Sequence, residues 1–446
     1  MKQNILRFSR AASVILTSLI AALMLAMSPS AQAVIEGVTG PTFELEAKPG
    51  YISTADGNSQ YMWGFANAGV SPVTMQYPGP TLIVNQGDTV TVNLSNALPV
   101  PVSIMFPGQS NVVTSANPGS APGEITQEAL VGGNVTYTFD AIEPGTYMYH
   151  SATQQALQIE MGLTGTLIVR PAAADPLHQA YSHEDTQFDH EYLFFLTEID
   201  PSIHDQVESQ VLAGEPVAID FSHHAPTLWF INGRTGPDTM LEANVPWLPN
   251  QPYNIVPRMH PGEKILLRVI GAGRDLHPFH THGNNTWLMA RDGRMLESAP
   301  GMGPDLATSN YTIQTVPGQT YDATFEWTGE ALNWDIYGHA PGDAMEPSEY
   351  APDHGKPFPE ISAGVPMMLP NILDLAEGQF YSGSPFLGSS VAPRPGQART
   401  NEFGGYFHMW HSHNEKELAN DDVFPGGMMT MVIIEPHGVP IPNANY

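Results

Sequence analysis

The sequence predicts an all-β protein made of two β-sandwich domains. Residues 89–94 read Thr-Val-Thr-Val-Asn-Leu, and this alternation of polar and apolar residues is typical of a strand with one buried face. No convincing amphipathic helix interrupts the strand-like pattern between residues 42 and 170. The pattern around Gly87 recurs around Gly262, which indicates that the domain is duplicated.

The first 33 residues are expected to be an export signal that is cleaved from the mature protein. Three basic residues lie within the first ten, residues 11–27 are almost wholly apolar, and Ala31-Gln32-Ala33 has the small-x-small form of a cleavage site. No later segment is apolar enough to span a bilayer. The protein is therefore predicted to be periplasmic or secreted.

Residues 42–170 are predicted to form the first sandwich. Gly87-Asp88 marks a turn between two strands within residues 81–94. Further strands are expected at residues 135–139, 145–150 and 165–169. These strands follow one another at short intervals along the sequence, so they are expected to pack as two sheets around one core.

Residues 190–446 are predicted to form the second sandwich. Eighteen residues lead from Gly262 to His280 and 20 lead to His282, and the same steps from Gly87 reach Met105 and Pro107. The strand endings repeat as well, because His150-Ser-Ala precedes the apolar run at 162–169 and His411-Ser-His precedes the run at 426–434. A Pro/Gly-rich stretch at about 340–404 is too long for an ordinary loop, so it is expected to be an insertion that covers a site or an interface.

The composition excludes several kinds of site and partner. The chain has 16 Lys and Arg against 45 Asp and Glu, a net charge of −29, so it would repel nucleic acid. It contains no cysteine, which excludes disulfides, thiolate zinc sites, iron–sulfur clusters and copper–thiolate centres. Cations and neutral molecules remain the expected partners.

Two pairs of histidines carry the strongest chemical signal. His280/His282 and His411/His413 are each two residues apart. Side chains at i and i+2 of a strand face the same way, so each pair aims two imidazoles at one point. Imidazole pairs suit a borderline divalent metal such as copper or zinc.

These motifs resemble the multicopper oxidases over nearly the whole mature chain. The resemblance is carried by Pro78-Gly-Pro-Thr-Leu-Ile-Val-Asn-Gln-Gly-Asp88, His277-Pro-Phe-His-Thr-His-Gly283 and His411-Ser-His413 followed by Gly427-Met428. It implies two cupredoxin-like Greek-key β-sandwich domains, copper as the cofactor, and kinship with the two-domain branch of the family. In that branch the cluster forms between the first domain of one subunit and the second domain of its neighbour, so a homotrimer is expected.

The same resemblance implies that the family's blue copper centre is lost. Ser412 stands where the family has the cysteine ligand, and Glu417 stands where it has a second histidine. His277 and a methionine at Met428 or 429 are the ligands of that centre that remain. The chain therefore looks like a degenerate multicopper oxidase.

The family's oxygen-reducing cluster is only partly retained. Met105 and Pro107 replace its first histidine pair, and the second pair keeps His150 but has Ala152. The expected ligands are thus His280, His282, His411, His413 and His150, with His277 beside them. Further candidates are Met105, Met428 and Glu417, because thioethers favour Cu(I) and a carboxylate with histidines can hold iron, manganese or zinc. Core packing of the methionines and a solvated acidic loop are the alternative interpretations.

Three hypotheses for function follow from these residues. The first is an exported copper-binding protein of the multicopper oxidase type, a non-blue oxidase in which the substrate is oxidised at the metal that meets oxygen. The second is a non-catalytic protein that sequesters or delivers copper outside the cytoplasm. The third is a partner-binding relic with empty sites. Neither the small-molecule electron donor nor the presence of catalysis follows from the sequence.

Overall fold

The computed structural model describes residues 34–173, 175–330 and 406–435, together with 339, 342, 344–345, 383–384, 439–441 and 444–445. The expected export signal at 1–33 and nearly all of the expected insertion at 340–404 lie outside these residues. Within the described part of the chain, no helix is long and apolar enough to cross a membrane.

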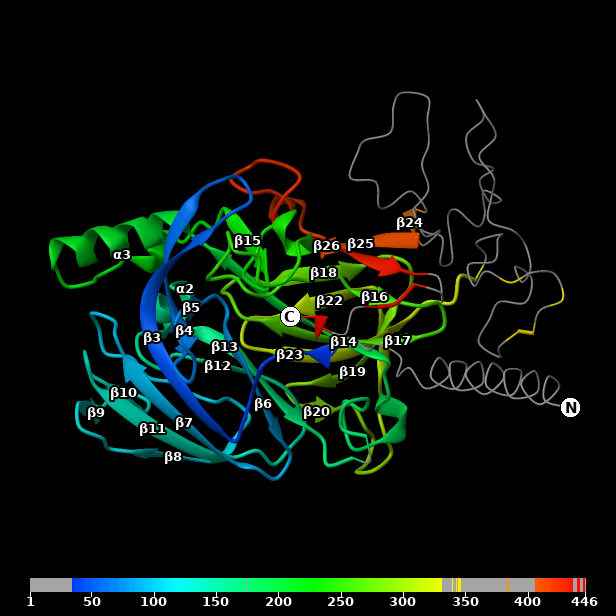
Figure 1. Ribbon diagram of the computed structural model, residues 1–446, viewed down its shortest axis with the longest axis horizontal. Helices are drawn as coiled ribbons and strands as arrows, with labels where there is room; N and C mark the ends of the chain where they lie inside the picture. The colour runs from blue at the N-terminus through cyan, green and yellow to red at the C-terminus, as the bar shows by residue number, and fades with distance from the viewer. Residues whose placement is uncertain are drawn as a thin grey trace, which may run out of the picture.

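The first sandwich consists of two sheets from the N-terminal half of the chain (Figure 1). One sheet has the order β5 (Met75–Gln76), β4 (Ser59–Asn67), β3 (Thr42–Ser53), β7 (Thr89–Asn96), β11 (Asn134–Asp140), β8 (Ser110–Ser115). The other has the order β12 (Gly145–His150), β13 (Thr164–Arg170), β6 (Gly79–Asn85), β2 (Val38–Thr39). A small hairpin, β9 (Ser120–Pro122) and β10 (Gln127–Ala129), lies outside both sheets.

The second sandwich is built in the same way from the C-terminal half. One sheet has the order β15 (Leu228–Ile231), β14 (His190–Ile199), β17 (Lys264–Gly271), β23 (Thr320–Glu326), β19 (Thr286–Arg291), β20 (Arg294–Met295), with β21 (Thr308–Asn310) beside β19. The other has the order β16 (Arg258–Met259), β26 (Met429–Ile434), β25 (Tyr406–Ser412), β18 (His277–Thr281), β22 (Thr312–Thr315), with β24 (Gly383–Ser384) beside β25. A separate two-stranded sheet pairs β1 (Val34–Ile35) with β27 (Ala444–Asn445), near the end of the chain.

The predicted fold class is confirmed, and the topology shows the duplication. In the first sandwich β3 runs parallel to β7, which is antiparallel to β11; in the second β14 runs parallel to β17, which is antiparallel to β23. Likewise β13 is antiparallel to β12 and parallel to β6 in the first sandwich, and β26 is antiparallel to β25 and parallel to β16 in the second. The predicted strands at 135–139, 145–150 and 165–169 are β11, β12 and β13 to within one residue.

The alternation read from the sequence is the alternation of burial in the structure. Along β7 every second side chain is buried, beginning with Val90, and the same holds along β11. The buried residues of these strands belong to one hydrophobic core between the two sheets. A separate core fills the second sandwich, around Trp327 and Trp410.

A helix of 6 residues that was not expected from the sequence, α2 (Gln155–Glu160), lies between β12 and β13. A longer helix, α3 (Pro201–Ala213), follows the first strand of the second sandwich and packs on β4 of the first. Its ends carry recognisable signals: the Asp200 side chain accepts a hydrogen bond from the backbone N–H of Ser202, and Gly214 ends the helix at a φ of 68°. Short 3₁₀ turns lie at η1 (Glu184–Thr186), η2 (Phe221–His223), η3 (Asp238–Met240) and η6 (Glu415–Leu418).

Buried charges join the two sandwiches. The Arg170 guanidinium, on β13, donates two hydrogen bonds to the Glu191 carboxylate on β14, and Arg268 Nε donates a third at 2.8 Å. All three side chains are almost completely buried. Burial alone would raise the pKa of Glu191, but the two guanidinium groups lower it to about 2. The carboxylate is therefore ionised, and its two cationic partners satisfy it.

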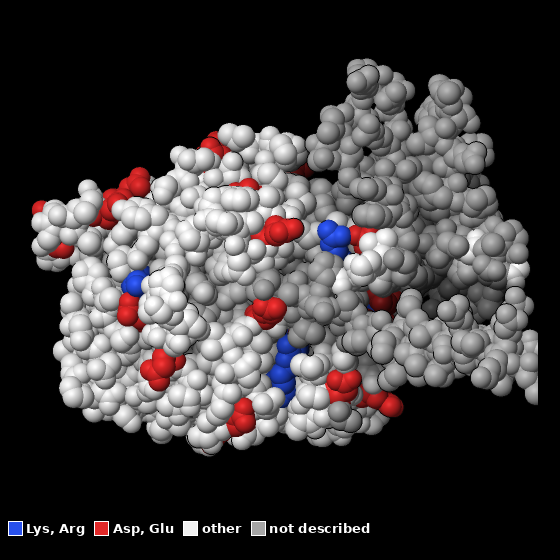
Figure 2. Space-filling model, viewed as in Figure 1, with Lys and Arg blue, Asp and Glu red and all other residues white. Residues whose placement is uncertain are grey.

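The surface has the acidic character that the composition predicts. Figure 2 shows acidic side chains spread over the visible face, with few basic ones among them. This distribution agrees with the net charge of −29.

Candidate metal centre

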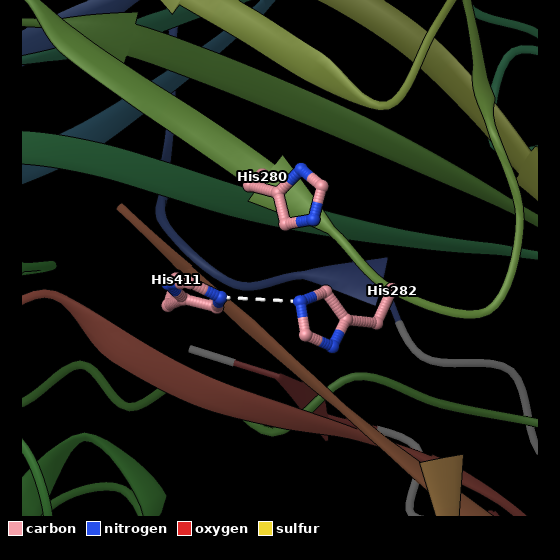
Figure 3. A group of neighbouring side chains, drawn as sticks. All are labelled: His280, His282 and His411. Carbon is pink, nitrogen blue, oxygen red and sulfur yellow. Dashed lines mark hydrogen bonds between the residues drawn. The ribbon is translucent and has the colours of Figure 1, made fainter. Parts of the chain in front are cut away.

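Two neighbouring strands bring three of the predicted ligands together. His280 on β18 lies directly opposite His411 on β25, and His282 follows the end of β18 (Figure 3). One nitrogen of each ring can be chosen such that the three atoms all lie within 4.8 Å of one another. His411 Nε2 is 3.2 Å from His282 Nε2. These three histidines are called the histidine group below.

The hydrogen bonds of the outer ring nitrogens orient the group. His411 Nδ1 lies 2.6 Å from the carbonyl oxygen of Ser412, so Nδ1 donates and Nε2 carries the lone pair. His280 Nδ1 lies 2.8 Å from Thr312 Oγ1, on the adjacent strand β22. A hydrogen bond at the second nitrogen of a ring is the usual way in which a metal-binding histidine is held.

The spacing of the donors fits a metal ion. Two imidazole nitrogens that bind one metal at about 2.0 Å in a tetrahedral arrangement lie about 3.3 Å apart. The observed 3.2 Å between His411 Nε2 and His282 Nε2 is close to that value. The group therefore fits copper or zinc by both geometry and donor type.

Burial and neighbouring charge keep the rings of His280 and His411 neutral at physiological pH. Burial, followed by the neighbouring His282, His411 and His413, lowers the pKa of His280 to about 4. Burial likewise lowers the pKa of His411 to about 4, against the opposing effect of the Ser412 carbonyl. Neutral imidazole is the form that binds a metal.

A turn that only glycine tolerates follows the second histidine. Gly283 has a φ of 98°, and a Cβ atom there would lie 2.8 Å from the His408 ring. This explains why the His280-Thr-His282 run ends in glycine. The backbone carbonyl of His282 is also held, because it accepts a hydrogen bond of 3.0 Å from Trp410 Nε1.

His413 lies next to the histidine group, at the surface. Its ring centroid is 4.8 Å from that of His280 and 5.8 Å from that of His411, on which it stacks. The side chain is exposed, unlike His280 and His411, which are 8% and 7% exposed. The half-exposed Tyr311 ring packs on the same His280 ring, with centroids 5.4 Å apart. The group is thus open to solvent on the side of His413 and Tyr311.

His150 and Met105 lie in the first sandwich and are not members of the histidine group. They are paired across an isolated bridge, and His150 Nδ1 lies 2.9 Å from the Ser151 carbonyl. Burial lowers the pKa of His150. Met105 Sδ accepts a hydrogen bond from Gln155 on α2, at 3.2 Å. The structure thus places these two candidates beside each other and leaves their part in metal binding a prediction.

The position of the family's blue copper is occupied by a buried charge cluster. His277 Nε2 is 2.8 Å from Glu198 Oε2, and His277 Nδ1 is 2.9 Å from Glu417 Oε2. All three side chains are 2% exposed or less. Although burial lowers the pKa of His277, the two carboxylates raise it to about 9. Both ring nitrogens are committed to carboxylates on opposite sides, so the residues here do not fit a copper ion.

The remaining candidates are used for packing or lie at the surface. Met428 is completely buried in the core of the second sandwich, as the packing interpretation of the methionines expects. Glu417 points inward to His277, whereas Glu415, Asp421 and Asp422 of the same acidic loop are exposed. The loop therefore does not gather its carboxylates at one point.

Two residues of the site could not be named from the sequence. Thr312 holds His280, and Glu198 holds His277, yet each lies more than 30 residues from its partner along the chain. An isolated Thr or Glu in a strand carries no motif. Only the pairing of the strands could have identified such a residue: Thr312 lies opposite His280 where β22 pairs with β18.

Comparisons with known proteins agree with this architecture. The family model described as "Multicopper oxidase" matches residues 53–174. A probable nitrite reductase-hydroxylamine oxidoreductase fusion protein of Kuenenia stuttgartiensis is 25% identical over 281 residues, 62% of this chain and 28% of the relative. Copper resistance protein A of Pseudomonas syringae pv. tomato is 30% identical over 121 residues, 27% of this chain and 18% of the relative.

A solved structure extends the likeness to both sandwiches. The blue copper oxidase of Nitrosomonas europaea has 20% sequence identity and a TM-score of 0.52, over 88% of this chain and 85% of that chain. This likeness concerns the fold. The matched part of our chain spans less than a third of the length of each of the two sequence relatives. Residues 53–174 therefore match a multicopper oxidase domain, the fold of both sandwiches is like that of a solved copper oxidase, and the chain contains no cysteine.

Proposed function

We propose that the chain binds copper at the histidine group and acts as a non-blue oxidase. The observation that carries this proposal is the convergence of His280, His282 and His411 where β18 pairs with β25. One ring nitrogen of each lies within 4.8 Å of the others. His413, whose ring centroid lies 4.8 Å from that of His280, would be the fourth donor. Copper bound there would supply one-electron exchange between an electron donor and dioxygen.

The protein groups around the site determine how a donor would reach it. The blue copper position is filled by His277 and its two carboxylates, so there is no separate entry point for electrons there. The donor would have to reach the histidine group itself, on the exposed side formed by His413 and Tyr311. Thr312 and the Ser412 carbonyl would keep the rings of His280 and His411 in the binding orientation.

Copper storage or delivery without turnover is the second candidate. The filled blue copper position favours this candidate, because a multicopper oxidase without its blue copper has lost the centre that accepts electrons from the substrate. The relative named copper resistance protein A is in line with such a role. Methionines such as Met105, beside His150, would suit Cu(I) in that case.

Export and assembly complete the proposal. The basic, apolar and small-x-small pattern of residues 1–33 supports a periplasmic or secreted protein. A homotrimer would bring His150 and Met105 of one subunit to the histidine group of another. Light scattering of the purified protein tests this, and a monomer would count against a shared site.

The deciding experiment combines metal content with oxygen uptake. Protein from copper-replete medium is compared with the His282→Ala/His411→Ala variant and with His178→Ala, a control outside the group. Wild type and the control should retain copper, and the double variant should lose it. Oxygen consumption with phenolic, cuprous or ferrous donors would support the oxidase. Copper retention without oxygen uptake would support storage, and a double variant that retains as much copper as the wild type would refute both.

A further inference from the structure

A second cluster of metal-binding side chains lies where the first sandwich meets α3. Glu160 ends α2, His204 is on α3, and His224 follows η2. Three segments distant in sequence therefore converge on one carboxylate. We infer that Glu160, His204 and His224 form a second metal site, which takes a divalent cation of the zinc type.

The distances place both histidines on the same carboxylate. His224 Nε2 is 3.1 Å from Glu160 Oε2, and His204 Nε2 is 3.7 Å from Glu160 Oε1. Glu160 and His204 are buried, whereas the His224 side chain is 11% exposed. The site is thus closed on the protein side and accessible from the side of His224.

The His204 ring is oriented as a ligand would be. Its Nδ1 lies 2.6 Å from the carbonyl oxygen of Tyr61, so Nδ1 donates there and Nε2 carries the lone pair of the neutral ring. Nε2 is buried and has no hydrogen-bond partner among the described residues, because 3.7 Å to Glu160 is too long for one. A buried lone pair that faces a carboxylate oxygen is unfavourable unless a cation or a proton lies between them.

The donor set matches that of known divalent metal sites. Two imidazoles and one carboxylate bind zinc or ferrous iron and leave positions open for water. Neighbouring ligands of such a metal lie about 3 to 3.5 Å apart; the distance of 3.1 Å falls within that range and the distance of 3.7 Å just above it. The three donors are spread more widely than those of the histidine group. Binding would therefore draw the ring of His224, on its surface loop, inward.

The molecule contains a similar cluster that is closed by hydrogen bonds. His190 Nε2 and His260 Nδ1 lie 2.8 Å and 3.0 Å from the two oxygens of Glu263. His260 Nε2 lies 2.8 Å from the carbonyl oxygen of Val439, so both nitrogens of that ring are used at ordinary hydrogen-bond distances. The Glu263 cluster contains the same residue types, but the His260 ring does not leave a nitrogen without a hydrogen bond as the His204 ring does. The Glu263 cluster therefore serves as the matched control.

Zinc titration tests the inference separately from the copper proposal. The His282→Ala/His411→Ala chain, which lacks the proposed copper ligands, is depleted of metal with a chelator and titrated with Zn²⁺ by calorimetry. One equivalent should bind. Adding His224→Gln or Glu160→Gln should weaken binding at least about 100-fold, more than loss of an outer partner does. Adding Glu263→Gln should leave the affinity unchanged.

Two further measurements keep the test decisive. His224 lies on a partly exposed loop, so His224→Gln should fold even if the buried Glu160→Gln does not; far-UV circular dichroism checks both. In the otherwise unchanged chain, His224→Gln should remove one equivalent of retained Zn²⁺. Absence of Zn²⁺ binding in the starting chain, or equal binding by the His224→Gln and Glu263→Gln variants, would overturn the inference.

Discussion

The charge cluster at the lost blue copper position should make the protein sensitive to alkaline pH. The two carboxylates raise the pKa of His277 from 6.5 to about 9, and the ring is completely buried. A group whose pKa is higher in the folded state stabilises the fold fully below its unfolded value and loses that contribution as the pH rises through the folded value. The affected window is therefore pH 6.5 to about 9.

The size of the effect follows from the shift. Each pKa unit corresponds to about 1.4 kcal/mol, so a rise from 6.5 to about 9 contributes about 3 kcal/mol to the free energy of unfolding. That is a large fraction of the stability of a typical domain.

Urea unfolding at a series of pH values between 6 and 10 measures this contribution. Other groups also titrate in this range, so the wild type is compared with His277→Gln, which cannot titrate there. The wild-type free energy of unfolding should fall by about 3 kcal/mol more than that of the variant across the window. Parallel curves for the two proteins, or an NMR titration that places the His277 pKa below 7, would refute the reasoning.

Three other predictions concern the site and the domain interface. Thr312→Val removes the hydrogen-bond partner of a histidine in the proposed copper group and should weaken copper binding about 10 to 100-fold in a competition titration. Ser412→Cys alone should not produce an intense blue absorption band with copper, because His277 remains bonded to two carboxylates; a strong band near about 600 nm would contradict this. Glu191→Gln leaves the buried Arg170 without its carboxylate and Arg268 with Asp322 alone, and should cost about 3 to 5 kcal/mol in urea unfolding, whereas Glu143→Gln at an exposed pair should change little.

Local patterns were sufficient to predict the fold class and to single out the histidines of the candidate metal centre. The period of two in β7 and β11 marks one buried face, and the repeated spacing from Gly87 and Gly262 marks the duplication. Histidines two residues apart must share a face of any strand that contains them. The pairing of β18 with β25 then places His280 opposite His411.

The tertiary structure decided what those residues meet. His277 is a histidine of the same motif as His280, yet it is enclosed by Glu198 and Glu417, which lie 79 and 140 residues away along the chain. No sequence spacing encodes that contact, because it depends on how separate strands and loops pack. The same holds for Glu160, which meets His204 and His224 only where α2 lies beside α3. The sequence by itself determined which side chains could bind a metal; the packing of distant segments determined which of them have a nitrogen facing a shared point and which are held by carboxylates.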